Sequence, residues 1–200
     1  MMDAEVSDLI GKTLRHVVRE GDDALHFVAD NGERWDMLHE QSCCENVSIE
    51  DIAGDLVDLV GSPILMAEIS TNSDDQRSDN KYPDESFTWT FYKLATIKGY
   101  VTIRWYGSSN GYYSETVSFR KVEWATRDAV EARLTDEIIG GDRRAAAVYA
   151  DWLEERGEAD HAAYVRGPHG DPDDPTKLVI DTEWLLAIGW ALRLQRSPAP

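Results

Sequence analysis

Residue types that often do chemistry gather in one short stretch, where His39, Cys43, Cys44 and Glu45 lie close together in the sequence. The two cysteines are the only ones in the 200-residue chain. Imidazole and thiolate groups are the preferred zinc ligands, so this stretch is a candidate metal site with zinc as the candidate ion. Adjacent cysteines point at one ion only awkwardly, however, and no second cluster of cysteine and histidine supplies further ligands.

The same stretch could instead hold a catalytic thiol, because His39 is near enough in sequence to act as a base for Cys43 or Cys44. Either chemistry would make the protein a metal- or thiol-dependent hydrolase. The surrounding acidic residues argue against a thiolate, since negative charge raises the pKa of a thiol. A third interpretation is structural, with one cysteine buried and the other facing a neighbouring layer. The sequence favours this third interpretation.

A second stretch is rich in side chains that recognise other proteins. Tyrosine and tryptophan provide a large contact area at a low entropic cost, which makes them frequent at binding surfaces. The predicted binding residues are Arg104, Trp105, Tyr106, Ser109, Asn110, Tyr112 and Tyr113. The alternative interpretation is a hairpin in which the aromatic side chains pack against each other across the strands.

The charge of the chain limits the class of partner. It has 38 acidic residues against 20 basic ones, a net charge of −18 at pH 7. Such a charge disfavours nucleic acids and anionic membranes and favours rapid encounter with a basic protein. Most of it lies in residues 1–90, whereas residues 91–127 are net positive. No apolar stretch is long enough for a membrane span and no signal peptide is recognisable, so we expect a cytoplasmic protein.

The elements that must position these residues are mostly strands. Alternating apolar residues over positions 13–38, with Asn31-Gly32 as a turn, predict an antiparallel meander. Apolar residues at three-to-four spacing after Ser48 predict a helix over residues 49–60. A strand is predicted over residues 64–69 and a polar loop over 70–86. Three further strands are predicted over residues 87–96, 100–106 and 112–122.

Beyond residue 124 the hydrophobic period becomes helical. Helices are predicted over residues 128–139, 143–156, 159–165 and 183–194, with a linker over 167–175. Asp151 and Glu155 lie four residues apart and could hold a cation, but an ion pair with Arg144 or Arg166 is the favoured interpretation. The predicted fold is therefore α+β, with an antiparallel β-rich domain containing one helix (residues 1–124) and a small all-helical domain (residues 125–200).

Two resemblances concern separate parts of the chain. The stretches HEQSCCE (residues 39–45) and WYGSSNGYYS (residues 105–114) resemble motifs of an uncharacterised bacterial and phage domain family. The stretch YADWLEERG (residues 149–157) resembles the repeat-companion domain, a helical accessory module of bacterial proteins. Neither family implies an activity or a cofactor.

Together these observations predict a protein-binding module and not an enzyme. The expected partner is a protein with a basic surface, without direct nucleic-acid or membrane binding. The first resemblance and the negative charge suggest an inhibitor, decoy or accessory factor in phage–host conflict, in antiviral defence or counter-defence. The competing hypothesis is the hydrolase that would use His39, Cys43, Cys44 and Glu45.

Overall fold

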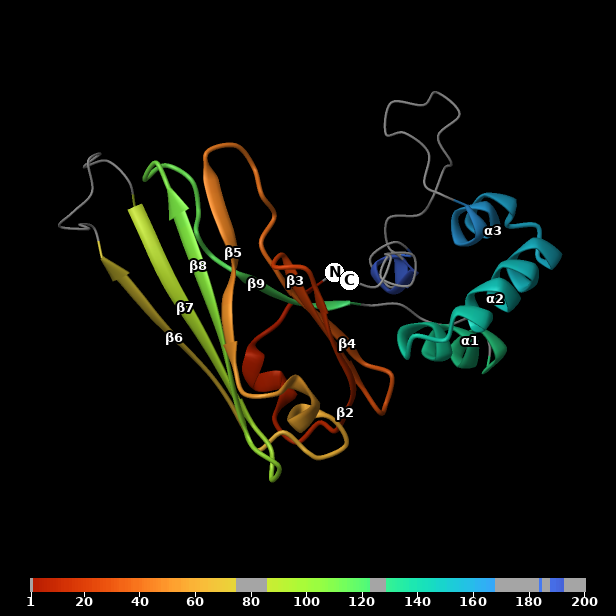
Figure 1. Ribbon diagram of the computed structural model, residues 1–200, viewed down its shortest axis with the longest axis horizontal. Helices are drawn as coiled ribbons and strands as arrows, with labels where there is room; N and C mark the ends of the chain where they lie inside the picture. The colour runs from red at the N-terminus through yellow and green to blue at the C-terminus, as the bar shows by residue number, and fades with distance from the viewer. Residues whose placement is uncertain (1, 75–85, 123–128, 168–183, 185–187, 193–200) are drawn as a thin grey trace. The chain divides into compact units, whose positions relative to one another are not determined.

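The computed structural model describes residues 2–74, 86–122, 129–167, 184 and 188–192. The chain divides into two compact units, Met1–Val122 and Glu123–Pro200. The first consists of strands and short 3₁₀ helices, and the second of α-helices (Figure 1). The predicted α+β class, with antiparallel sheets first and helices last, is confirmed at this level.

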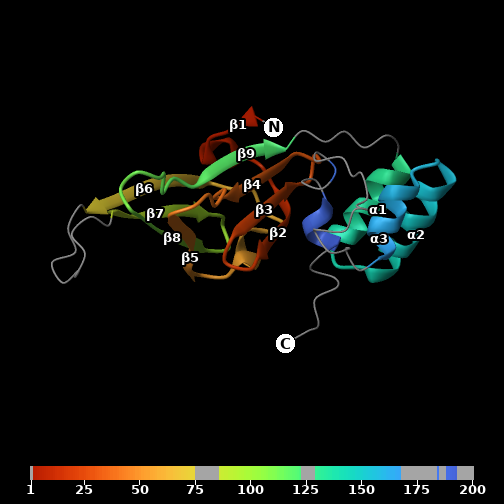
Figure 2. The same ribbon diagram turned by 90° about the horizontal axis from the view of Figure 1, so that it is seen from above.

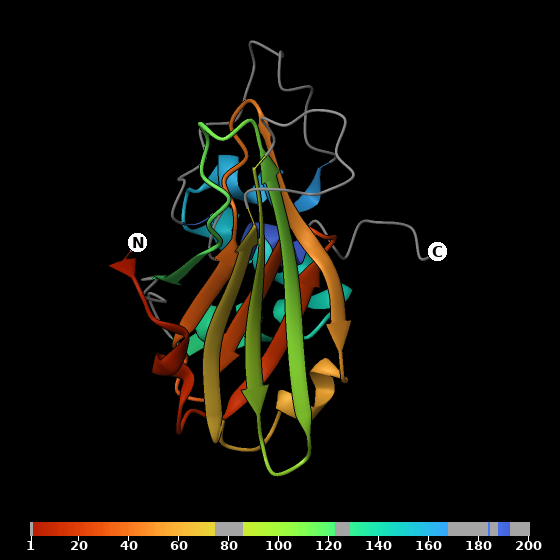
Figure 3. The same cartoon turned by 90° about the vertical axis from the view of Figure 1, so that its left-hand side faces the viewer.

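The first unit is a sandwich of two antiparallel sheets, which lie one behind the other in Figure 3. The five-stranded sheet has the order β1 (Met2–Asp3), β9 (Ser118–Val122), β4 (Arg34–Leu38), β3 (Ala24–Ala29) and β2 (Leu14–Glu20). The four-stranded sheet has the order β5 (Glu45–Ala53), β8 (Tyr100–Ser109), β7 (Ser86–Ala95) and β6 (Met66–Asp74). Figure 2 shows β1 beside β9 at one edge. The predicted meander corresponds to β2, β3 and β4, and Gly32 turns the chain between β3 and β4 with φ 85°.

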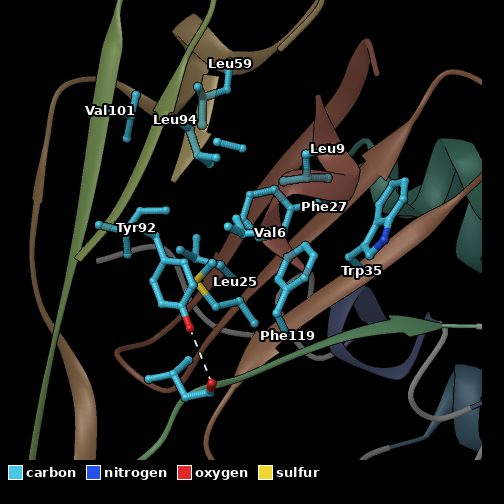
Figure 4. Packing of buried hydrophobic residues seen from close by; sticks show 14 of the residues in the cluster. Val6, Leu9, Leu25, Phe27, Trp35, Leu59, Tyr92, Leu94, Val101 and Phe119 are labelled. Carbon is cyan, nitrogen blue, oxygen red and sulfur yellow. Dashed lines mark hydrogen bonds between the residues drawn. The ribbon is translucent and has the colours of Figure 1, made fainter. Parts of the chain in front are cut away.

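The core lies between the two sheets. Successive side chains of a strand point to opposite faces, so every second residue reaches the core. Leu25 and Phe27 of β3 contribute from one sheet, and Tyr92 and Leu94 of β7 from the other (Figure 4). All four are nearly or fully inaccessible to solvent.

The predicted helix over residues 49–60 is wrong. This segment forms the end of β5 and a short 3₁₀ helix, η2 (Leu56–Leu59). A β-bulge shifts the pairing of β5 with β8 between Ile49 and Asp51, so the side chains nearest the core are those of Val47, Ile49 and Ile52. Their spacing of two and then three residues imitates a helical period.

Other predictions for the first unit need smaller corrections. Strand β6 continues to Asp74, so the start of the predicted polar loop is strand, and residues 75–85 lie outside the described part. Strand β9 begins at Ser118, so residues 112–117 are not strand. A second short 3₁₀ helix, η1 (Val6–Leu9), precedes β2.

The second unit contains α1 (Ala129–Ile139), α2 (Arg143–Glu155) and α3 (Ala159–Arg166), close to the predicted bounds. Asp142 caps α2 by accepting a hydrogen bond from the Arg144 backbone N–H at 2.8 Å. Arg166 pairs with Asp151, as the ion-pair interpretation expected, and with Glu154 at 2.7 Å. Trp184 and residues 188–192 are helical, while the rest of the predicted last helix and nearly all of the linker lie outside the described residues. Within the described chain, no helix combines the length and the apolar character that a membrane span requires.

Candidate functional site

Two loops meet at one end of the sandwich because of the strand order. The β4–β5 loop (residues 39–44) and the β8–β9 loop (residues 110–117) both cross from one sheet to the other. Since β4 pairs with β9 and β5 pairs with β8, the two crossings lie side by side (Figures 1 and 3). His39 Nδ1 lies 2.9 Å from the Thr116 carbonyl oxygen and joins them. The two motifs singled out in the sequence are thereby brought together.

His39 and Glu45 shape the β4–β5 loop. Their side chains are 7% and 2% exposed, and His39 Nε2 lies 3.6 Å from Glu45 Oε1. The Glu45 carboxylate accepts hydrogen bonds from the backbone N–H groups of Ser42, Cys43 and Cys44, the last two at 3.3 and 3.2 Å. Burial alone would raise the pKa of Glu45, but these donors outweigh it and lower the pKa. Glu45 therefore acts as a clamp for the loop backbone.

Cys43 and Cys44 are both exposed, which corrects the prediction that one of them is buried. Both residues lie on the solvent-exposed β4–β5 loop and not on a strand, so no alternation of side chains turns one of them towards the core. The two Sγ atoms lie 3.2 Å apart. The contact with Cys43 raises the pKa of Cys44, and the two thiols in turn raise the pKa of Tyr113 in the β8–β9 loop. A raised thiol pKa is the opposite of what a cysteine nucleophile needs.

The proposed zinc ligands do not form one coordination set. In the described ranges, no group of three or more His, Cys, Asp or Glu side chains is placed to hold a metal ion. His39 and Glu45 are engaged with the loop backbones, whereas the thiols point to solvent. These four residues are close in the sequence, but the fold does not place them around one ion.

The predicted aromatic binding surface separates into three environments. The prediction that Trp105 belongs to a binding surface is wrong, because this residue is completely buried. Its Nε1 group donates to Met37 Sδ at 3.4 Å. The alternation along β8 sends Trp105 and Ser109 inward and leaves Arg104 and Tyr106 on the outer face. Arg104 Nε lies 2.9 Å from Glu50 Oε2 on that face.

The remaining predicted residues, Asn110, Tyr112 and Tyr113, lie on the β8–β9 loop. Asn110 Oδ1 accepts a hydrogen bond from the Tyr112 backbone N–H at 3.1 Å and stabilises the turn. Tyr112 is 86% exposed, and its ring centroid lies 5.4 Å from that of Tyr113. Of the predicted residues, this pair of tyrosines provides accessible aromatic surface beside the two thiols.

A polar cavity of about 300 Å³ lies beneath the β8–β9 loop. The inner face of β7 is apolar at Leu94 and Tyr92, which belong to the core, and carries serine and threonine side chains towards Ser86. The cavity lies over this polar end of the strand. Burial and the charge of Glu5 raise the pKa of Tyr92 to about 12, so its hydroxyl stays protonated and donates to the Val117 carbonyl at 3.3 Å. The hydroxyl residues that line the cavity are Thr71, Ser86, Thr88, Thr90, Ser114 and Thr116.

Of the described residues that line this cavity, Glu115 is the one acidic residue, and it is only 9% exposed. Thr88 Oγ1 donates to Glu115 Oε2 at 2.6 Å, and Ser109 Oγ donates to Oε1 at 2.8 Å. Both donors are neutral, and among the residues that the structure describes no lysine or arginine pairs with this carboxylate. Within the described ranges, Glu115 is thus a nearly buried carboxylate without a basic partner.

The sequence carries a signal for Glu115 that lies just outside the two motifs. Glu115 is the only acidic residue between Glu85 and Glu123, in a segment where basic residues predominate. It also directly follows the motif at residues 105–114. An isolated acid beside a motif is a weak signal for a site, but it distinguishes this residue from the many acids elsewhere.

The family described as a domain of unknown function, DUF7448, matches residues 7–119. The chain belongs to this family. The matched range includes both loops, the two cysteines and Glu115, so the whole candidate site lies within the DUF7448 domain. No curated protein and no solved structure matches the chain.

The DUF7448 domain therefore presents two chemically distinct features at one end of its sandwich. One is a polar cavity containing a carboxylate that is held by hydroxyl groups. The other is an exposed dithiol on a clamped loop. The first favours recognition of a cation, because its carboxylate is already oriented and partly desolvated.

Proposed function

We propose that the DUF7448 domain is a protein-binding module whose cavity receives a basic side chain of its partner. The observation that carries this proposal is Glu115, a residue that is only 9% exposed and whose carboxylate accepts hydrogen bonds from two neutral hydroxyls, with no basic donor among the described residues. Burying a charge without a counter-charge is costly, so the site gains stability when a cation enters. Lysine and arginine are the cationic groups that a protein partner offers.

The size and surroundings of the cavity support this assignment. A volume of about 300 Å³ is at the small end of ligand pockets, which suits one side chain better than a large cofactor. The hydroxyl groups of Thr90 and Ser114 can accept hydrogen bonds from an ammonium or guanidinium group. Tyr112 and Tyr113 on the same loop provide contact area for the partner backbone.

The net charge of −18 supports a basic partner independently of the cavity. A field of this sign increases the rate of encounter with a positively charged protein and repels nucleic-acid phosphates. The proposed partner is therefore a basic protein and not a nucleic acid or a membrane.

The hydrolase alternative has weaker support. It needs a reactive thiolate or a complete metal ligand set, but the pKa of Cys44 is raised and His39 and Glu45 are engaged with the loop. A role as inhibitor, decoy or accessory factor in phage–host conflict is compatible with the binding proposal. It rests on the resemblance of the first unit to a phage-associated family and on the charge. The accessory role proposed for the second unit rests on its resemblance to the repeat-companion domain.

The test uses small probes of one side chain each. N-acetyl-arginine amide and N-acetyl-lysine amide are titrated into the ¹⁵N-labelled full chain, and N-acetyl-citrulline amide serves as the neutral control. We expect saturable shifts of backbone amide signals near Thr88 and Glu115 with at least one cationic probe and none with citrulline. The shifts should weaken as salt rises from about 0.01 to 0.15 M, because screening reduces the attraction.

Two variants distinguish binding in the cavity from attraction by the overall negative charge of the protein. Glu115→Gln keeps the shape and removes the charge, and it should weaken binding at least about fivefold, since a partly desolvated charge pair contributes about 1 kcal/mol or more. Glu50→Gln removes an acid on the outer sheet face and should leave binding unchanged. Equal binding of the cationic and citrulline probes, or equal binding by wild type and Glu115→Gln, would refute the proposal.

A further inference from the structure

The two thiols have no role in the proposed recognition of a basic side chain. Cys43 and Cys44 are adjacent, exposed and reduced, and their Sγ atoms lie 3.2 Å apart. They are the only cysteines in the sequence, so any thiol chemistry of this chain takes place here.

The loop around the thiols is held in place by contacts that do not use the sulfur atoms. Glu45 accepts hydrogen bonds from three consecutive backbone N–H groups, those of Ser42, Cys43 and Cys44. His39 joins the start of the loop to the Thr116 carbonyl oxygen at 2.9 Å. Both sulfurs are therefore presented on the same side of a fixed backbone.

This geometry disfavours a disulfide between the two cysteines. Consecutive Cα atoms are about 3.8 Å apart across a trans peptide, below the usual range of about 4.4–6.8 Å for disulfides. The peptide bonds of the described chain are all trans. The pair is instead suited to a larger atom that bridges both sulfurs.

The sulfur separation indicates which kind of atom fits. With element–sulfur bonds of about 2.3 Å, as in zinc thiolates, the 3.2 Å separation corresponds to an angle of about 88° at the bound atom. A tetrahedral ion would need a separation of about 3.8 Å with the same bond length, and further protein ligands. Trivalent arsenic and antimony form pyramidal centres with angles close to a right angle and prefer soft sulfur ligands.

We propose that Cys43 and Cys44 form a two-sulfur binding site for trivalent arsenic or antimony compounds. An arsonous acid, R–As(OH)₂, reacts with the two thiols to give R–As(S–Cys)₂ and two molecules of water. Two As–O and two S–H bonds break while two As–S and two O–H bonds form. The arsenic stays trivalent, so no oxidant or reductant is needed. His39 and Glu45 hold the loop and do not bind the ligand.

The test uses phenylarsine oxide with the full-length protein in the presence of excess glutathione, a competing monothiol. Intact-mass spectrometry should show one phenylarsenic group bound per chain, and 1,2-ethanedithiol should remove it. Cys43→Ser and Cys44→Ser should each weaken the adduct roughly 100-fold or more, because a single sulfur loses the chelate effect. A single-cysteine variant that keeps wild-type affinity would overturn the proposal.

A second measurement tests whether the folded loop matters. Adjacent cysteines in an unfolded chain can also react, so the competition with glutathione is repeated for the wild-type protein in urea. The folded protein should hold phenylarsenic at least tenfold more tightly than the unfolded chain in the same assay. Equal affinities would overturn the claim that the structure forms the site. The variant Glu45→Ala should lie between the two if it remains folded by circular dichroism, and full folded-state affinity in it would contradict the clamp.

Discussion

The close approach of Glu115 to the sheet depends on the absence of a side chain at Gly107. A Cβ atom at this position of β8 would lie 2.8 Å from Glu115 Cβ, 3.1 Å from the Glu115 carbonyl oxygen and 3.3 Å from Val47 Cγ2. The backbone of Gly107 is not in the left-handed region, so alanine is tolerated there conformationally. Gly107→Ala therefore tests packing and not backbone strain.

The expected loss of stability combines two opposing effects. Adding a methylene-sized group to a well-packed site costs about 1–3 kcal/mol. Replacing glycine by alanine within a strand recovers about 0.5–1 kcal/mol of conformational entropy. We therefore expect Gly107→Ala to lower the free energy of unfolding by about 1–2 kcal/mol. Because the nearest atoms belong to Glu115, the loop should move and weaken the hydrogen bonds from Thr88 and Ser109 to its carboxylate.

The control is Gly99→Ala, also outside the left-handed region. Its added Cβ would meet Asp58 Oδ2 at 2.8 Å, which is the far end of a flexible, surface side chain that can rotate away. We expect a change within about 0.5 kcal/mol. Urea unfolding of the full chain, followed by tryptophan fluorescence, measures both variants. The reasoning is wrong if Gly107→Ala is as stable as Gly99→Ala and binds the cationic probe as tightly as the wild type.

Two other predictions concern stability and domain organisation. Burial would lower the pKa of His26, but its hydrogen bonds to Asp36 at 2.8 Å and Glu20 at 3.3 Å outweigh this and raise it above 6.5. The stabilisation from the protonated ring should be complete below pH 6.5 and be lost as pH rises through the folded-state pKa. In urea unfolding, His26→Gln should remove this pH dependence of the free energy of unfolding. The same pH dependence in the variant and the wild type would contradict the assignment. Fragments 1–124 and 125–200 should each fold alone, with strand-type and helical circular dichroism respectively, and an unfolded spectrum for either would count against the boundary.

The sequence predicted those elements whose signal is local. The helices α1, α2 and α3 have a helical hydrophobic period, and β7 and β8 are rich in β-branched and aromatic residues. The segment of β5 was misassigned because its bulge after Ile49 changes the phase of an otherwise alternating strand. A bulge depends on the partner strand, so it leaves no reliable mark in the sequence of β5 alone.

The candidate site was predictable only in part for the same reason. The motif residues near positions 39–45 and 105–114 could be recognised, but their meeting depends on the pairing of β4 with β9 and of β5 with β8. The sequence also could not separate Trp105, which is buried, from Tyr112, which is 86% exposed. That difference follows from where β8 ends, because the alternation that buries Trp105 stops at Ser109.

Alternation along β8 also explains how one short motif serves both the core and the proposed site. The inward positions change from Trp105, which fills the core, to Gly107, which admits Glu115, and then to Ser109, which donates to its carboxylate. The proposed specificity therefore depends on a single buried charge, whereas the net charge of −18 acts at long range. Long-range charge governs mainly the rate of association, and a desolvated ion pair governs mainly the rate of dissociation. Attraction by the acidic surface alone would bring many basic proteins to the domain, but only those with a side chain that reaches Glu115 would be retained.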